Sequence, residues 1–131
     1  MKAFFLFAIL ASVTLAAAAQ TADKTSAVKH VDVKQAEKLI SDHKVIILDV
    51  RTPGEFKSGH IAGATNIDFN SRDFEKAIAT LPKTNSYLVH CAVGGRSTHS
   101  LKLFEKNDFK SIYHLDGGIQ AWEKAGLPTE K

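Results

Sequence analysis

Residues 86–97 read Ser-Tyr-Leu-Val-His-Cys-Ala-Val-Gly-Gly-Arg-Ser, and their pattern indicates the fold class. Its first part, residues 86–90, is a largely apolar run, which is typical of a strand buried on both faces of a parallel sheet. The segment from Cys91 to Gly95 predicts a tight, glycine-bearing loop, and residues 97–107 have the spacing of a helix. A buried strand, a short loop and a helix in succession form the building unit of an α/β domain.

The same alternation continues on both sides of this stretch. Apolar runs predict strands at 45–48 and 112–115, with shorter strands expected at 30–33 and 65–67. Helices are predicted at 33–42 with Asp32 as N-cap, at 53–58, at 73–81 and at 119–124. Strands that alternate with helices in this way predict an α/β fold with a central parallel sheet flanked by helices on both faces. Such sheets bind ligands at the carboxyl ends of their strands, which is where Cys91 falls.

The loop after Cys91 has the composition of an anion-binding turn. Its backbone N–H groups and the N-terminus of the following helix are expected to point at the sulfur. Gly94 and Gly95 allow the backbone angles that such a turn requires, and Arg96 adds a permanent positive charge. These features favour a thiolate, so we expect the pKa of Cys91 to lie below its ordinary value. A thiolate held in this way suits a reaction in which the protein carries a second, anionic sulfur atom as a persulfide.

The chain has 131 residues, a formal net charge of +3 and Cys91 as its single cysteine. This length fits one domain, and the interspersed charges do not indicate nucleic-acid binding. Residues 1–19 combine Lys2, an apolar run and a series of alanines, which predicts a secretory signal peptide, with an uncleaved membrane anchor as the alternative. A flexible arm is expected at 20–29 and a single domain at 30–131. The expected location is a bacterial periplasm or the exterior of the cell, without membrane contact after cleavage.

Several short motifs in a fixed order resemble the rhodanese family of sulfurtransferases. The segment from Cys91 to Ser97 matches the active-site pattern Cys-x-x-Gly-x-Arg-Ser of that family. The other matching motifs are Leu48-Asp49-Val50-Arg51, Glu55-Phe56, Gly59-His60-Ile61-x-Gly63-Ala64-x-Asn66-Ile67, Leu115-Asp116-Gly117-Gly118 and Trp122. The resemblance covers nearly all of the chain after the signal peptide. It implies an α/β fold around a parallel sheet, a catalytic cysteine and no cofactor.

The resemblance also implies roles for individual residues. Cys91 is the expected nucleophile, which takes sulfur from a small anionic donor such as thiosulfate and passes it to cyanide, a thiol or a protein partner. The residues expected to bind the substrate are Ala92, Val93, Gly94, Gly95, Arg96 and Ser97. Ser97 is also expected to cap the following helix. Arg51 is expected either to bind the substrate or to pair with Glu55.

Two other functions remain open. A noncatalytic sulfur carrier or persulfide-binding partner would load Cys91 from a protein donor and turn over small donors weakly. Phosphatases and arsenate reductases of the same fold have a loop one residue longer than the segment between Cys91 and Arg96. The shorter ring is expected to fit a single sulfur atom better than a phosphate, which favours sulfur transfer.

The histidines show no metal-ligand spacing, so no metal site is expected. His60 is expected to fix the loop that follows it, and His90 to point away from Cys91 because neighbouring residues of a strand face opposite sides. The remaining histidines, expected at the surface or in packing, are His30, His43, His99 and His114.

Overall fold

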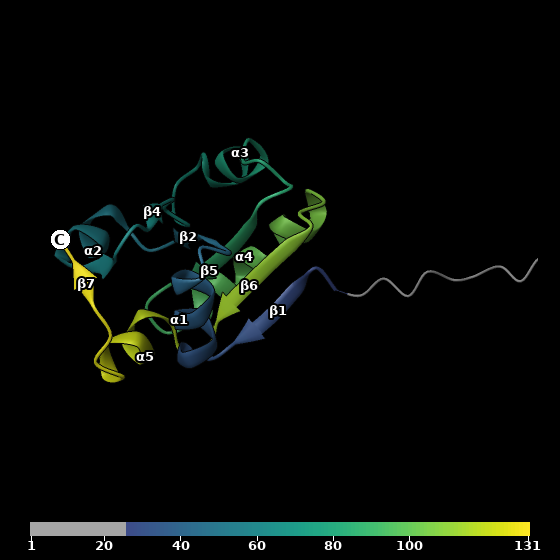
Figure 1. Cartoon of the computed structure of the whole chain (residues 1–131). Helices are drawn as coiled ribbons and strands as arrows, with labels where there is room; N and C mark the ends of the chain where they lie inside the picture. Colours follow the sequence, from purple (N-terminus) through teal and green to yellow (C-terminus); the bar gives the residue numbers. More distant parts are fainter. Residues whose placement is uncertain (1–25) are drawn as a thin grey trace, which may run out of the picture.

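The computed structural model describes residues 26–131, and its centre is a five-stranded parallel sheet with the strand order β1-β6-β5-β2-β4 (Figure 1). The strands are β1 (Val28–Val31), β2 (Ile46–Asp49), β4 (Thr65–Asn66), β5 (Ser86–His90) and β6 (Ser111–Leu115). β5 pairs with β2 on one side and with β6 on the other, so the strand before Cys91 lies in the middle of the sheet. This arrangement confirms the predicted α/β fold.

Within residues 26–131, five helices accompany the sheet, namely α1 (Val33–Ser41), α2 (Pro53–Ser58), α3 (Phe74–Ala79), α4 (Gly95–Lys106) and α5 (Gly118–Lys124). Side chains alternate between the two faces of a strand, and β5 shows this directly. Tyr87 and Val89 pack into one core cluster with buried residues of α3 and α4. Leu88 packs into a second cluster with buried residues of α1 and α5. Each face of the sheet therefore has its own apolar core under its own helices.

Two boundaries differ from the sequence prediction. β1 begins at Val28, two residues before the expected start of the domain, because its backbone pairs with β6. α4 begins at Gly95, earlier than predicted, and its N-cap is Gly94, which has a left-handed backbone with φ 119°. Ser97 therefore lies in the first turn of the helix and does not cap it. This places its hydroxyl where it can reach the Cys91 loop.

A short antiparallel pair lies outside the central sheet. β3 (His60–Ile61) pairs with β7 (Thr129–Glu130) at the C-terminus, in regions where no strands were predicted. His60 Nδ1 donates a hydrogen bond to the Phe56 carbonyl oxygen, 2.9 Å away, and the ring stacks on the Phe56 ring. Its expected role in fixing the local loop is therefore consistent with these contacts.

Within residues 26–131, no helix combines the length and the apolar character that crossing a membrane requires. The expected signal peptide at 1–19 lies outside the described residues, as does most of the expected arm at 20–29. β1 therefore marks the first element of the domain that the structure describes.

Candidate active site around Cys91

Cys91 directly follows β5, at the carboxyl edge of the sheet and in front of the N-terminus of α4. The backbone N–H of Gly94 donates a hydrogen bond to Cys91 Sγ at 3.1 Å, and the Ser97 hydroxyl donates another at 3.3 Å. The left-handed backbone of Gly94 produces the turn that aims its own N–H at the sulfur. Cys91 as a whole is only 1% exposed, so the sulfur lies inside the loop and not at its rim.

Two opposing effects act on the pKa of Cys91. Burial raises the pKa, because a charged sulfur is less well solvated there. Hydrogen bonds from the Ser97 hydroxyl and from the backbone N–H groups of Ser97, Gly94 and Val93 stabilise the thiolate and lower the pKa. These hydrogen bonds outweigh burial, so the pKa lies below its ordinary value, in the direction that the sequence predicted.

Ser97 begins a chain of hydrogen bonds that the sequence analysis missed. Its Oγ lies 2.7 Å from Nε2 of His114, and Nδ1 of the same ring lies 2.9 Å from Asp116 Oδ1. His114 is buried on β6, so it does not lie at the surface, and it forms hydrogen bonds in addition to packing. The signal that could have found it is topological. Neighbouring parallel strands end at one edge of the sheet, which brings the residues at the ends of β5 and β6 together.

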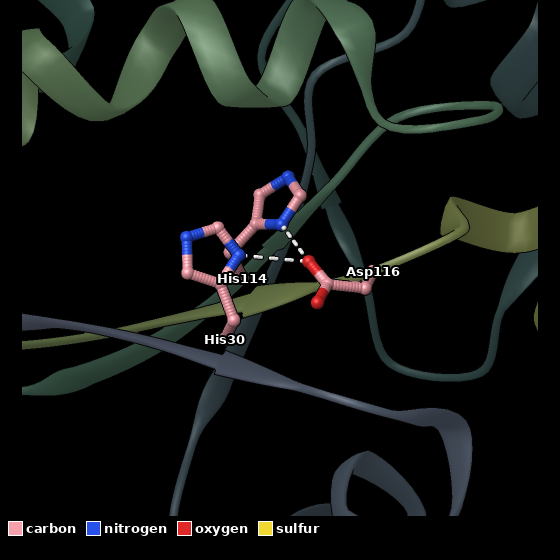
Figure 2. Close-up of side chains that lie close together, drawn as sticks. All are labelled: His30, His114 and Asp116. Carbon is pink, nitrogen blue, oxygen red and sulfur yellow. Dashed lines mark hydrogen bonds and ion pairs between the residues drawn. The ribbon is translucent and has the colours of Figure 1, made fainter.

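Asp116 also interacts with a second imidazole, that of His30. His30 Nδ1 lies 2.8 Å from the same Asp116 Oδ1, and Figure 2 shows both rings converging on that oxygen. Partial burial raises the pKa of Asp116, but hydrogen bonds from His30 and His114 more than offset this, so the pKa lies below its ordinary value. Sequence spacing gave no indication of this cluster, because His30 and His114 become neighbours only through the pairing of β1 with β6.

Removal of the Ser97 hydroxyl tests its effect on the sulfur. Ser97→Ala is expected to lower the rate of Cys91 alkylation by iodoacetamide at neutral pH by about fivefold, because the thiolate loses one donor. Ser100→Ala is the matched control, since Ser100 is also buried on α4 but its hydroxyl donates to the Ser97 carbonyl oxygen. An equal loss of rate in both variants would show that helix packing, and not the Ser97 donor, governs the thiol.

Arg96 is held by a carboxylate. Its guanidinium forms two parallel hydrogen bonds to Glu55, at 2.7 Å and 2.9 Å, across 41 positions of sequence. Glu55 belongs to α2, and its Oε1 also accepts a hydrogen bond from the N-cap residue Thr52. The pair is partly exposed beside the Cys91 loop. It fixes the guanidinium in place and neutralises much of the charge that the sequence analysis assigned to anion attraction.

The Arg96 pair gives the protein a defined acid response. The hydrogen bonds from Arg96, partly opposed by burial, lower the pKa of Glu55 from 4.5 to about 2. The pair therefore contributes its full stability above about pH 4.5 and loses it as the pH falls toward 2. Because the pair is partly exposed, the contribution is expected to stay below about 1 kcal/mol.

Urea unfolding at pH 7 and pH 3 measures this contribution. Wild type is expected to be more stable than Glu55→Gln at pH 7, with the difference shrinking at pH 3 as Glu55 becomes protonated in the unfolded chain. A difference that is the same at both pH values would contradict the assigned pairing of Arg96 with Glu55.

Arg51 has a different partner from the one expected. Its guanidinium donates to both carboxylate oxygens of Asp49, at distances down to 2.7 Å, and to the Gly59 carbonyl oxygen at 2.7 Å. The side chains of Arg51 and Asp49 are 8% and 0% exposed. The expected pairing of Arg51 with Glu55 is wrong, because Glu55 is occupied by Arg96. In this arrangement Arg51 ties the end of β2 to the segment after α2.

His90 is buried beside the site but does not bind the sulfur. Its Nδ1 donates to the Cys91 carbonyl oxygen at 3.0 Å. Burial, only partly opposed by the Asp49 charge, lowers the pKa of His90, so the ring is neutral at physiological pH. Its Nε2 has no hydrogen-bond partner among the described residues. These contacts agree with the expectation that His90 is not the base for Cys91.

The N-terminus of α5 holds the Cys91 loop through backbone hydrogen bonds. The backbone N–H of Ile119 donates to the Cys91 carbonyl oxygen at 3.0 Å, and that of Gln120 donates to the Ala92 carbonyl oxygen at 3.1 Å. Gly118 lies directly against the loop, since a Cβ atom there would meet both carbonyl oxygens at 2.5 Å. The loop thus sits between α4 and α5. The side chain of Val93 points outward and is 59% exposed.

Comparison with known proteins gives a consistent result. Residues 32–125 match the model of the rhodanese-like domain. Thiosulfate sulfurtransferase 16, a chloroplastic protein of Arabidopsis thaliana, is 34% identical over 102 residues, covering 70% of this chain and 83% of that protein. The crystal structure of a rhodanese-related protein from Thermoplasma volcanium has a TM-score of 0.70 and 27% identity, covering 78% of this chain and 97% of that chain.

Some similar proteins are considerably longer than this chain. The tRNA uridine(34) hydroxylase of Pelagibacter ubique is 37% identical over 91 residues, which are 69% of this chain but 30% of that protein. Rhodanese-like domain-containing protein 14 of Arabidopsis thaliana, also chloroplastic, is 29% identical, and the match covers 79% of this chain and 65% of that protein. The similarity therefore concerns one domain, which in these relatives is joined to further sequence.

Proposed function

The chain belongs to the family of rhodanese-like domains, and on that premise we propose that it is a sulfurtransferase that carries a sulfur atom on Cys91. The family includes sulfurtransferases such as the Arabidopsis relative. The observation that carries the proposal is the position of Cys91 Sγ, which accepts hydrogen bonds from Gly94 and Ser97 at the end of a central strand. These donors favour the thiolate that the reaction needs, without a separate base.

The proposed reaction has two displacement steps. The Cys91 thiolate attacks the outer sulfur of thiosulfate, a new S–S bond forms, and the bond to the sulfonate breaks, so that sulfite leaves with the electron pair. The persulfide that remains has a terminal anionic sulfur, and we expect the N–H groups of the loop to stabilise it. Cyanide then attacks this outer sulfur, thiocyanate leaves, and the Cys91 thiolate returns. No net oxidation or reduction of the protein occurs over the cycle.

The burial of Cys91 and the charge around it bear on the choice of substrate. Cys91 is 1% exposed and Arg96 is paired with Glu55, so a dianion such as thiosulfate meets little free positive charge. Exposed Val93 offers an apolar contact next to the loop, which suits a protein donor or acceptor. A sulfur carrier that exchanges with a protein partner therefore remains the second candidate. Export to a bacterial periplasm, inferred from residues 1–19, is part of the same proposal.

Intact-mass measurement after incubation with thiosulfate tests the proposal. The expected result is a gain of one sulfur atom, which is lost on addition of cyanide and does not occur in Cys91→Ser. Loading by a persulfidated protein but not by thiosulfate would favour the carrier. Turnover of an aryl phosphate without sulfur loading would overturn the proposal in favour of a phosphatase, which the short segment between Cys91 and Arg96 already disfavours.

A further inference from the structure

Three side chains that could hold a metal ion meet near the carboxyl ends of β1 and β6. His30 lies on β1, His114 lies on β6, and Asp116 follows β6. The two histidines are direct partners in the parallel pairing of these strands. One ligand atom from each residue lies within 4.8 Å of the others, and both Nδ1 atoms face the same carboxylate oxygen at 2.8 Å and 2.9 Å (Figure 2).

We propose that His30, His114 and Asp116 bind a divalent transition-metal ion of the Zn²⁺ class. Two imidazole nitrogens and one carboxylate oxygen suit Zn²⁺ and Cu²⁺, whereas Ca²⁺ and Mg²⁺ prefer oxygen ligands only. The side chains of His30 and Asp116 are 56% and 57% exposed, so an ion can enter from solvent and these ligands can adjust. Three protein ligands leave a coordination position for water.

The surroundings of His114 match those of a metal ligand. Its ring is almost fully buried, and its Nε2 lies 2.7 Å from Ser97 Oγ. A histidine that ligates through one nitrogen is usually held by a hydrogen bond at the other, and this bond fixes both the tautomer and the ring orientation. Ser97 provides that contact here. One rigid ligand and two adjustable ones therefore converge on one point.

The cluster is connected to Cys91 through the single proton of the Ser97 hydroxyl. Without an ion, the Asp116 carboxylate can only accept from His114 Nδ1, so in the neutral ring Nε2 is an acceptor. Nε2 therefore competes with Cys91 Sγ and the Gly94 carbonyl oxygen for the Ser97 proton. An ion on Nδ1 moves the ring proton to Nε2, which then donates to Ser97 Oγ. The Ser97 hydroxyl then no longer has His114 as a competing acceptor, which strengthens its existing hydrogen bond to the sulfur. The total number of protons is unchanged. The hydrogen bond between His114 and Ser97 reverses its direction, and ligation of the ion replaces the hydrogen bond between His114 Nδ1 and Asp116.

Calorimetric titration with Zn²⁺ tests the site in a background that lacks the thiol, Cys91→Ser. The expected result is one bound ion, with affinity reduced at least about tenfold by His30→Ala or by Asp116→Asn. His43→Ala is the matched control and is expected to change nothing, because His43 is exposed on the turn after α1. Absence of binding, or binding that the His30 and Asp116 substitutions leave unchanged, would overturn the site.

The connection to Cys91 has its own test, which rests on the proposed role of that thiol but needs no sulfur donor. With native Cys91, saturating Zn²⁺ is expected to raise the rate of iodoacetamide alkylation by about twofold, because the Ser97 proton is no longer shared between His114 and the sulfur. The same addition to His30→Ala is expected to give no increase. A rate that Zn²⁺ leaves unchanged or lowers in the wild type would disprove the connection, whether or not sulfur transfer itself is observed.

Discussion

Gly118→Ala is expected to reduce sulfur loading of Cys91 by at least about tenfold and to lower the free energy of unfolding by about 3 kcal/mol. The new Cβ would lie 2.5 Å from the carbonyl oxygens of both Cys91 and Ala92, which are backbone atoms and cannot rotate away. The backbone φ of +59° adds strain for any L side chain. α5 must therefore move away from the loop, and the support that its N–H groups give to Cys91 is lost.

A second glycine distinguishes the effect of the steric clash at position 118 from the effect of the positive φ. Gly126 has a similar φ of +75°, but a Cβ there would meet no atom within 4 Å. Gly126→Ala is therefore expected to cost only about 1–2 kcal/mol and to keep sulfur loading near the wild-type level. Urea unfolding and persulfide mass compare the two variants. If Gly118→Ala loaded sulfur as well as Gly126→Ala does, the proposed support of the loop by α5 would be incorrect.

Arg51→Met is expected to lower the free energy of unfolding by about 3–5 kcal/mol. Asp49 is fully buried. Among the lysines and arginines of residues 26–131, only Arg51 pairs with it, and the substitution removes that pair. A buried carboxylate without its cation loses both the ionic attraction and several hydrogen bonds. The double variant Arg51→Met with Asp49→Leu is expected to recover part of the loss, since it leaves no buried charge.

An exposed ion pair provides the comparison for Arg51. Lys38 pairs with Asp42 at 2.8 Å, but its side chain is 78% exposed, so Lys38→Met is expected to leave the urea midpoint unchanged. Equal stability of Arg51→Met and wild type would contradict the assigned structural role. If such a variant also had a raised KM for thiosulfate, Arg51 would instead bind the substrate, which is the other role that its sequence position suggested.

The α/β fold could be predicted because its signals are local. The apolar run at 86–90, the glycines of the next loop and the helical spacing after it lie within one short stretch, and similar units recur along the chain. The β3 and β7 pair could not be predicted in this way. Each strand has only two residues, and they become strands only because the C-terminus returns to pair beside α2.

The site was predictable only in part, for a similar reason. Cys91, Gly94 and Ser97 are close in sequence, so the chemistry of their loop could be inferred from the residues alone. The pairing of Arg96 with Glu55 joins different elements, and so does the hydrogen bond of Ser97 to His114. Contacts of this kind depend on strand order, which no single segment specifies. Burial of His114 likewise follows from the position of β6 between β1 and β5.

The pH dependence of Cys91 alkylation measures whether main-chain and hydroxyl donors hold a negatively charged sulfur at position 91. The thiol of cysteine in model peptides has a pKa of about 8.5. We predict a midpoint clearly below that value in the wild type, moving upward in Ser97→Ala. A wild-type midpoint at or above the ordinary value would mean that burial prevails over the donors, and the assignment of Cys91 as a nucleophile would fail.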